Sequence, residues 1–418
     1  MQIRLMVSPA ILTLSLLNLP KISTAQEENY LSLQSVISTV ELNNPQLMAV
    51  RNEIAAARGR GWTTWVLADP ALSIEWEGVP EGSGLGQYGE RRIALSQKIE
   101  FPTNILWRNR LAGGEVEIAE MRYEQSRFEI RASAITAYFQ YLVARDGLSL
   151  AHERVALAQE FVDKAEFRHE VGEAPAIERV RTRVELARAQ NDLRSAESAF
   201  ESAKARLNTV LGRPPDAEII TSDSLVYESF DLSLTDIKQH ALDNHPRLHE
   251  ASARVGVAAN LRKLAWGTLL PALEISGFQQ NIEGNPDFYG FQIGFSVPLW
   301  FAFRQRGEIQ HANASLAAQE SHRVQARLQL LADVETAYAS FGATASQLKN
   351  FEKTLLTQAD EVYRIALRSY EEGEVGYLQL LEAQQTLIEV RQGHIEALAN
   401  YYTAIAELEK AGAVIVLK

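Results

Sequence analysis

The sequence contains no cysteine among its 418 residues. This absence excludes disulfide bonds, thiolate metal sites and thiol catalysis. It also excludes a lipid attached to an N-terminal cysteine. A basic excess is missing too: the formal net charge is −12, whereas a nucleic-acid-binding surface carries a basic patch or stripe. We therefore expect no nucleic-acid partner.

Long hydrophobic runs are missing except at the start of the chain. Arg4 supplies a positive charge, and residues 5–19 form an apolar run that Pro20 ends. Small residues at 23–25 offer a cleavage site before Gln26, so residues 1–25 are predicted to be a secretory signal peptide. The alternative is an uncleaved N-terminal anchor, although a bilayer span takes about 20 apolar residues. The mature chain is expected to be exported without a membrane helix.

Motifs for catalysis and for cofactors are missing as well. The glycine-rich residues 82–86 lie between two expected strands and lack a phosphate-loop lysine, which argues against nucleotide binding. His240, His245 and His249 form the only histidine cluster, and the last two could share a helical face and ligate a metal. No cysteine or carboxylate completes a ligand shell, and the first half of the chain has Asn44 at the place of His245. A solvated helix start is therefore the better interpretation, and we expect no enzyme activity, no cofactor and no metal site.

The chain does contain one pattern that occurs twice, about 200 residues apart. Four short segments recur: Asn44-Pro45 as His245-Pro246, Pro70-Ala71-Leu72 as Pro271-Ala272-Leu273, Thr136-Ala137-Tyr138 as Thr336-Ala337-Tyr338, and Gly172-Glu173 as Gly373-Glu374. The offsets are 201, 201, 200 and 201 residues, and a spacing kept this closely indicates two copies of one structural unit. We therefore divide the mature chain into a first repeat, residues 26–215, and a second repeat, residues 216–418.

Each repeat is predicted to begin with a helix and to continue with a β-hairpin. The helical period covers residues 30–67, with a restart at Pro45, and about residues 232–270 in the second copy. Apolar residues then alternate with polar or small ones, which predicts strands at about residues 71–78, 91–100, 271–283 and 288–299. Segments of about ten residues with one apolar face are typical of a membrane β-barrel. A water-soluble hairpin with one buried face has the same local pattern, so the strands alone do not decide.

A very long helix is predicted after each hairpin. Residues 103–171 and 304–372 contain no proline and few glycines, and at about 1.5 Å per residue each helix would be roughly 100 Å long. A glycine turn ends each one, and the chain returns as a helix with coiled-coil spacing, as in Leu186, Leu193 and Phe200. A soluble periplasmic coiled-coil adaptor or scaffold protein would show the same helical pattern.

Four strands per chain are too few to close a barrel, because about eight are needed to fill even the smallest one with side chains. Lipid tolerates no open sheet edge, so strands that span a membrane must be pooled by several chains. Two chains would supply eight strands and three would supply twelve, and a barrel wide enough to conduct solutes favours the larger number. The same symmetry would gather the long helices into a tube beneath the barrel.

In the order of its elements the mature chain resembles the TolC-type outer-membrane efflux channels. Helix, hairpin, proline, long helix, glycine turn and return helix occur twice, and the segments most like the family are VGEAPAIERV and EGEVGYLQLLEAQ. The resemblance implies a mainly α chain that forms a homotrimer, with a 12-stranded transmembrane β-barrel in outer-membrane lipid and an α-helical tunnel through the periplasm. It further implies a passive exit duct whose partners are a periplasmic adaptor and a proton-driven inner-membrane pump.

The cargo is less well defined. Length and short external loops are similar to those of the outer-membrane components of heavy-metal efflux systems of the cobalt–zinc–cadmium type. Metal ions or small toxic compounds are therefore the expected cargo. Type I secretion channels share the architecture, so a secretion exit channel is an alternative.

The resemblance also assigns candidate functional residues. The expected adaptor-docking residues are Val171, Gly172, Glu173 and Ala174 in the first tip and Glu372, Gly373, Glu374 and Val375 in the second. The family often has two aspartates three residues apart at the pore constriction, and Gln379 and Glu382 stand at those positions, so only one is acidic. Val375 replaces a basic residue often found in the second tip. Both tip glycines fit a turn with positive φ or a close approach of another backbone, and turn formation alone is the alternative role of the tips.

Overall fold

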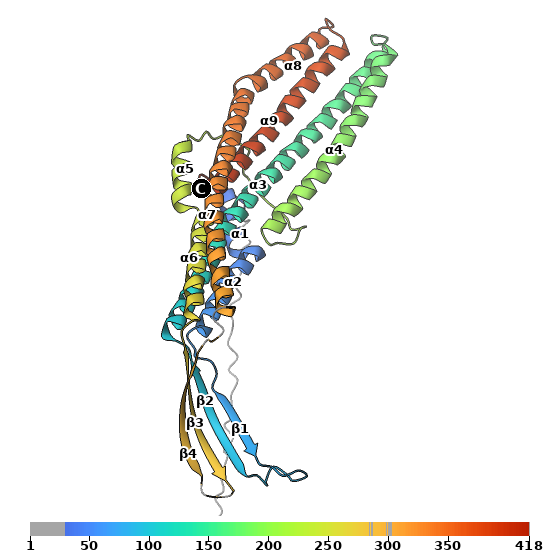
Figure 1. The fold of residues 1–418 in the computed structure, drawn as a ribbon. Helices are drawn as coiled ribbons and strands as arrows, with labels where there is room; N and C mark the ends of the chain where they lie inside the picture. The colour runs from blue at the N-terminus through green and yellow to red at the C-terminus, as the bar shows by residue number, and fades with distance from the viewer. Residues whose placement is uncertain (1–29, 284, 286, 298, 300–302, 418) are drawn as a thin grey trace, which may run out of the picture.

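The computed structural model describes residues 30–417 except residues 284, 286, 298 and 300–302. The signal peptide expected at residues 1–25, and its cleavage before Gln26, therefore lie outside the described residues. The molecule is long and narrow. A β-sheet lies at one end, and the two turns that connect pairs of helices lie at the other (Figure 1). None of the described helices has a stretch long and apolar enough to cross a membrane.

The chain forms the same series of elements twice. The first copy consists of α1 (Leu33–Asn43), α2 (Pro45–Thr63), β1 (Ala71–Glu77), β2 (Glu90–Ile99), α3 (Pro102–Glu170) and α4 (Ala176–Val210). The second copy consists of α5 (Leu234–Asn244), α6 (Pro246–Gly267), β3 (Ala272–Ile282), β4 (Phe288–Ser296), α7 (Arg304–Asn350), the π-helix η1 (Phe351–Leu355), α8 (Leu356–Glu371) and α9 (Tyr377–Gly412). The strands start within one residue of the expected positions, and β4 ends three residues earlier than expected.

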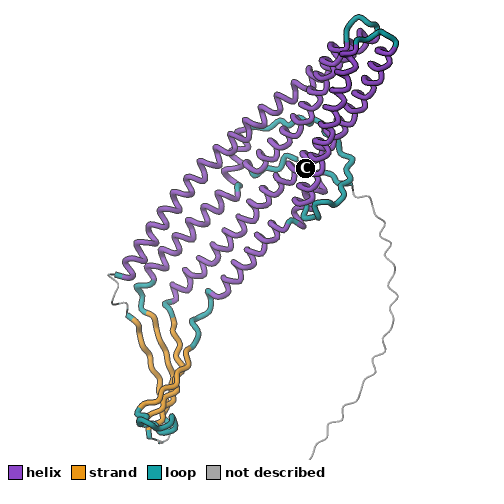
Figure 2. Tube along the Cα trace, turned by 90° about the vertical axis from the view of Figure 1, so that its right-hand side faces the viewer, coloured by secondary structure: helices purple, strands orange, loops and turns teal. Residues whose placement is uncertain are grey.

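The four strands form one antiparallel sheet in the order β1-β2-β3-β4, so the two repeats meet at the β2–β3 pair. The sheet continues the line of the helices and extends beyond them (Figure 2). Its apolar face is bare: Leu72 at one edge and Phe295 at the other are each 68% exposed. No described element of the chain covers this face, so neither hairpin has a face buried within the chain. Within the described residues, β1 and β4 each keep an unpaired edge.

The two long helices differ. α3 is unbroken over 69 residues, about 100 Å, whereas the second helix was expected to be continuous over residues 304–372 and is instead interrupted by η1. The repeat offset gives the reason, because it is 200 residues between Tyr138 and Tyr338 but 201 between Gly172 and Gly373. The second copy thus has one extra residue in this stretch, and a single π-turn accommodates it inside an otherwise α-helical segment.

The main hydrophobic core lies near the middle of the molecule, where α1 and α5 pack on the long helices. The repeated Thr-Ala-Tyr segment has a structural role there. The hydroxyl of Tyr138 donates to the carbonyl oxygen of Leu31 at 3.2 Å. In the second repeat, the hydroxyl of Tyr338 donates to the carbonyl oxygen of Leu232 at 2.9 Å. Each tyrosine therefore fastens the chain just before the first helix of its own repeat.

Candidate functional site

The first tip is the turn between α3 and α4. Gly172 has a φ of +81°, a conformation that residues with a side chain rarely adopt, and this allows the chain to reverse. The backbone N–H groups of Glu173 and Ala174 then donate to the carbonyl oxygen of Arg168, at 2.8 and 3.2 Å. Val171 and Glu173 are exposed, whereas Ala174 is buried under the turn. The first tip thus presents one apolar and one acidic side chain to its surroundings.

The second tip, between α8 and α9, has the same geometry. Gly373 has a φ of +76°, and the N–H groups of Glu374 and Val375 donate to the carbonyl oxygen of Ser369, at 2.8 and 3.3 Å. The Ser369 hydroxyl also donates to the carboxylate of Glu374 at 3.2 Å. Glu372 and Glu374 are exposed and Val375 is half-buried. Both tips lie at the end of the molecule that is farthest from the sheet (Figure 1).

The conformation of the two tip glycines identifies why glycine is used. A Cβ atom added to Gly172 or Gly373 would have no described atom within 4 Å beyond its chain neighbours. Glycine is therefore required at both positions by the positive φ. It is not required by a close approach of another part of the chain. The space around both turns is open, so another molecule can come close to the backbone there.

An aromatic and ionic contact joins the two hairpins just behind the tips. The hydroxyl of Tyr370 in α8 donates to Glu178 Oε1 in α4 at 2.8 Å. The guanidinium of Arg168 lies 5.1 Å from the centre of the Tyr370 ring and 3.8 Å from the Glu178 carboxylate. Phe161 and Tyr377 pack in the same cluster. The cluster therefore connects all four helices that reach the tips.

The charge states in this cluster favour the contact. Burial, followed by the hydrogen bond to Glu178, raises the pKa of Tyr370, so its hydroxyl keeps its proton. The hydrogen bond with Tyr370 is the main cause that raises the pKa of Arg168. Sequence reasoning missed the cluster because the first repeat has His169 and Ala176 at the places of Tyr370 and Tyr377. The available signal was two tyrosines seven residues apart on either side of the second turn.

Gln379 and Glu382, the expected constriction pair, lie on the first turns of α9 and are exposed. Together with Val375 they line a groove of about 390 Å³ between α8 and α9. The Glu382 carboxylate makes no ion pair with any described residue of the chain. The structure therefore brings the second tip and the constriction pair to one surface, while the first tip lies on the other hairpin.

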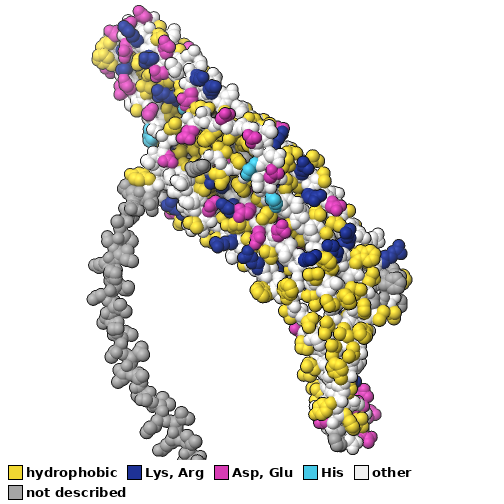
Figure 3. Space-filling view, turned by 90° about the vertical axis from the view of Figure 1, so that its left-hand side faces the viewer, with side chains coloured by type: hydrophobic (Ala, Val, Ile, Leu, Met, Phe, Trp, Pro, Cys, Tyr) yellow, Lys and Arg dark blue, Asp and Glu magenta, His cyan; other side chains and the backbone are white. Residues whose placement is uncertain are grey.

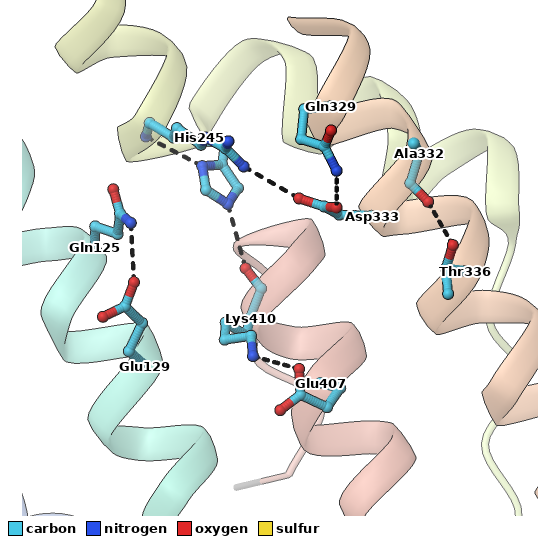
Figure 4. A network of polar contacts seen from close by, with 10 residues as sticks. Gln125, Glu129, His245, Gln329, Ala332, Asp333, Thr336, Glu407 and Lys410 are labelled. Carbon is cyan, nitrogen blue, oxygen red and sulfur yellow. Dashed lines mark hydrogen bonds and ion pairs between the residues drawn. The ribbon is translucent and has the colours of Figure 1, made fainter. Parts of the chain in front are cut away.

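The histidine cluster has a structural role that the sequence analysis described wrongly. His245 was interpreted as part of a solvated helix start, but it is only 7% exposed. Its Nδ1 accepts from the backbone N–H of Arg247 at 3.1 Å, and its Nε2 lies 3.2 Å from the carbonyl oxygen of Lys410 (Figure 4). His245 is the N-cap of α6, as Asn44 is the N-cap of α2. The recurrence of Asn-Pro as His-Pro is therefore a recurrence of helix capping.

The other two histidines also bond to backbone groups. His240 Nδ1 lies 3.1 Å from the carbonyl oxygen of Gly412, and His249 Nε2 lies 3.0 Å from that of Asp243. The three rings thus bond to three different parts of the chain and do not face one common point. In the described part of the chain, no group of three or more His, Asp or Glu side chains is arranged to hold a metal ion.

Comparison with known proteins agrees with this architecture. Residues 74–213 and 237–413, which cover both repeats, match the family described as "Outer membrane efflux protein". The chain belongs to the outer membrane efflux protein family. The family resemblance inferred from the order of elements is confirmed, and with it an efflux function in the outer membrane. The family consists of transport proteins.

Relatives of this efflux protein match most of its length. It is 23% identical over 385 residues to the cobalt-zinc-cadmium resistance protein CzcC of Cupriavidus metallidurans, with 91% of this chain and 89% of that protein covered. It is 24% identical over 342 residues to the toluene efflux pump outer membrane protein TtgF of Pseudomonas putida, with 79% and 70% covered. Its fold is similar to that of the Campylobacter jejuni CmeC outer membrane channel, with a TM-score of 0.79, 16% identity and coverage of 91% and 85%.

Proposed function

We propose that the efflux protein works as a homotrimer, in which three four-stranded sheets form one 12-stranded barrel in the outer membrane. The observation that carries this proposal is the bare apolar face of a sheet whose two edge strands, β1 and β4, each keep one edge unpaired by any described residue. In water, the apolar face of the sheet and the unpaired edges of β1 and β4 would both be exposed, which is unfavourable. Lipid covers the face, and neighbouring copies pair the edges.

The same assembly makes the helices into a periplasmic tunnel. The four helices α2, α3, α6 and α7 lie side by side above the four strands (Figure 2), so three copies would extend the barrel wall as a helical wall. Three-fold symmetry would place three copies of Gln379 and of Glu382 around the far end of the bore. Three carboxylates at a constriction favour cations over anions.

The tips are the proposed contact with a periplasmic adaptor. Both have exposed side chains, open space around their glycines and a position at the end opposite the sheet. The docking residues are those named above in the two turns, residues 171–174 and 372–375. Energy for transport would come from an inner-membrane pump that the adaptor connects to the tunnel.

Divalent metal ions are the proposed cargo, with small toxic organic compounds as the second candidate. The likeness to the cobalt-zinc-cadmium resistance protein covers more of this chain than the likeness to the toluene efflux protein does. The unpaired carboxylate of Glu382 at the proposed constriction also suits cationic cargo.

The assembly is tested by the mass of the purified full-length protein in detergent, measured by native mass spectrometry. Three chains per particle, extracted from the outer membrane only with detergent, are expected. A monodisperse monomer that stays soluble without detergent would contradict the proposal, because the bare sheet face would then need no lipid.

A further inference from the structure

The ends of the helices that adjoin the sheet carry more positive than negative charge. Residues 58–70, 100–115, 254–271 and 303–308 contain nine Arg or Lys and four Asp or Glu. The whole chain, by contrast, has 53 acidic and 41 basic residues. A local excess of positive charge in an acidic protein therefore surrounds the junction of helices and sheet.

Apolar and basic side chains follow a fixed order in the two helices that run toward the sheet. In α2, Arg58 precedes Trp62 by four residues, and in α6, Arg262 precedes Trp266 by four. Residues four apart share a helix face, and Trp62 is 77% exposed. On both helices the tryptophan is nearer the sheet, and the arginine lies about one turn, roughly 5 Å, farther from it. Arg58 also contacts Glu120 at 2.7 Å.

The same order holds in the two helices that run away from the sheet. In α3 the exposed Leu106 precedes Arg110 by four residues, and Phe303, which is 78% exposed, precedes Arg306 in α7 by three. The sequence order is reversed relative to α2 and α6, but the spatial order is unchanged. Figure 3 shows apolar side chains extending from the sheet onto the adjoining helix ends, with Lys and Arg side chains just beyond them.

Two of these basic side chains form an unusual pair. Arg110 and Lys263, from α3 and α6, both lie over the ring of Trp107, at 4.7 and 4.4 Å from its centre. Neither makes an ion pair with a described residue, so two cations share one indole and neither is paired with a carboxylate of the described chain. Each gains from the ring, but they repel each other. An anion bound close to both would offset that repulsion.

The dipole of α7 makes a second unfavourable contribution to the electrostatic energy of the basic residues at this junction. The N-terminus of a helix is positive and favours anions, yet α7 begins with Arg304 and has Arg306 as its third residue. Arg304 is compensated by Glu308 at 3.3 Å, whereas Arg306 makes no ion pair with a described residue. Other basic residues of the junction, such as Arg58 and Arg108, pair with carboxylates of the chain. Arg110, Lys263 and Arg306 have no carboxylate partner among the described residues, so they can meet negative charge from outside the chain.

We propose that Arg58, Arg110, Arg262, Lys263 and Arg306 form a basic collar that binds the phosphate groups of anionic phospholipids in the periplasmic leaflet of the outer membrane. The inference rests on the proposed function, because it requires the sheet to lie in that membrane. A headgroup layer is about 5–8 Å thick on each side of the hydrocarbon. This thickness matches the one helical turn that separates the exposed apolar side chains at the helix ends from the basic collar. Tryptophan next to the sheet is likewise typical of a membrane interface.

The test uses the purified full-length assembly in vesicles that contain dansyl-labelled phosphatidylglycerol. Energy transfer from tryptophan reports the labelled lipid, and unlabelled phosphatidylglycerol or phosphatidylcholine competes for it. The variant is Arg110→Gln with Lys263→Gln. Its matched control is Arg323→Gln with Arg327→Gln, which removes two exposed charges from α7 roughly 30 Å from its start at the sheet. Each removed charge should weaken the preference for phosphatidylglycerol about fivefold, and the pair roughly thirtyfold, while the control keeps it.

Equal preference in the wild type and both variants would overturn the proposal. So would displacement of the labelled lipid by millimolar inorganic phosphate, since that would identify a site for a soluble anion. If the collar variant fails to fold by circular dichroism, the wild type decides alone: its preference must fall from low to high salt. Failure to insert into vesicles of either lipid would contradict the proposed function, whereas insertion into both without preference contradicts only the collar.

Discussion

Replacing the tip glycines separates adaptor docking from turn formation. We consider the double variants Gly172→Leu with Gly373→Leu and Gly172→Asn with Gly373→Asn. Both glycines have positive φ, +81° and +76°, which costs an ordinary side chain about 1–2 kcal/mol per site. No neighbouring atom adds a clash, so the leucine pair should lower the free energy of unfolding by about 2–4 kcal/mol per chain. Asparagine is of similar size but tolerates this conformation, so its cost is smaller.

Three measurements then distinguish the roles: export of metal ions by cells that also produce the pump and adaptor, the yield of assembled protein from the outer membrane, and thermal unfolding. If the tips dock an adaptor through close backbone approach, both double variants lose export. Only the leucine variant should lose appreciable stability. Gly82→Leu is the matched control, because Gly82 also has positive φ, +80°, and open surroundings but lies in the loop between β1 and β2. It should keep export.

The reasoning is refuted if the asparagine variant exports at the wild-type rate with normal yield. A fall in export that follows the yield of assembled protein in every variant, Gly82→Leu included, would show that the glycines serve the turns alone.

Three further predictions concern the constriction, a helix cap and the π-turn. Glu382→Gln should lower the cation preference of single channels in planar bilayers, and unchanged selectivity with lowered stability would instead indicate a role in packing. Burial lowers the pKa of His245 below its usual value near 6.5, so its contribution to stability should be complete above that pH and be lost as the pH falls from there through the folded-state pKa. His245→Asn, which copies Asn44, should keep the cap and abolish this acid-sensitive step in thermal unfolding measured against pH. Deleting Lys353 should convert η1 into regular helix and keep assembly and export, whereas deleting His152 from α3 should rotate the first tip by about 100° and abolish export; equal effects of the two deletions would contradict the role given to η1.

The architecture was predictable because the sequence contains two copies of one structural unit. Repeat spacing, strand alternation and the lack of proline in the long helices are local patterns, and the structure has the elements that they predict. The π-turn was also encoded, in the change of repeat offset from 200 to 201 between Tyr338 and Gly373. It was missed because a one-residue insertion leaves the apolar period on either side unchanged and shifts only its phase, by about 100°.

Contacts between distant segments were not predictable. His245 resembled an exposed helix start because Lys410, whose carbonyl oxygen lies 3.2 Å from its ring, is 165 residues away. Tyr370 and Glu178 are 192 residues apart and belong to positions where the two repeats differ. Repeat comparison emphasises what the halves share, so it passes over a contact that exists only once.

The central claim is that the sheet spans the outer membrane and the tips face the periplasm, and cysteine labelling tests it most directly because the chain has no cysteine of its own. Ser83→Cys, in the loop between β1 and β2, should react with a membrane-impermeant maleimide on intact cells. Glu173→Cys, at the first tip, should react only after the outer membrane is breached. Labelling of Glu173→Cys on intact cells, with Ser83→Cys protected, would contradict the account.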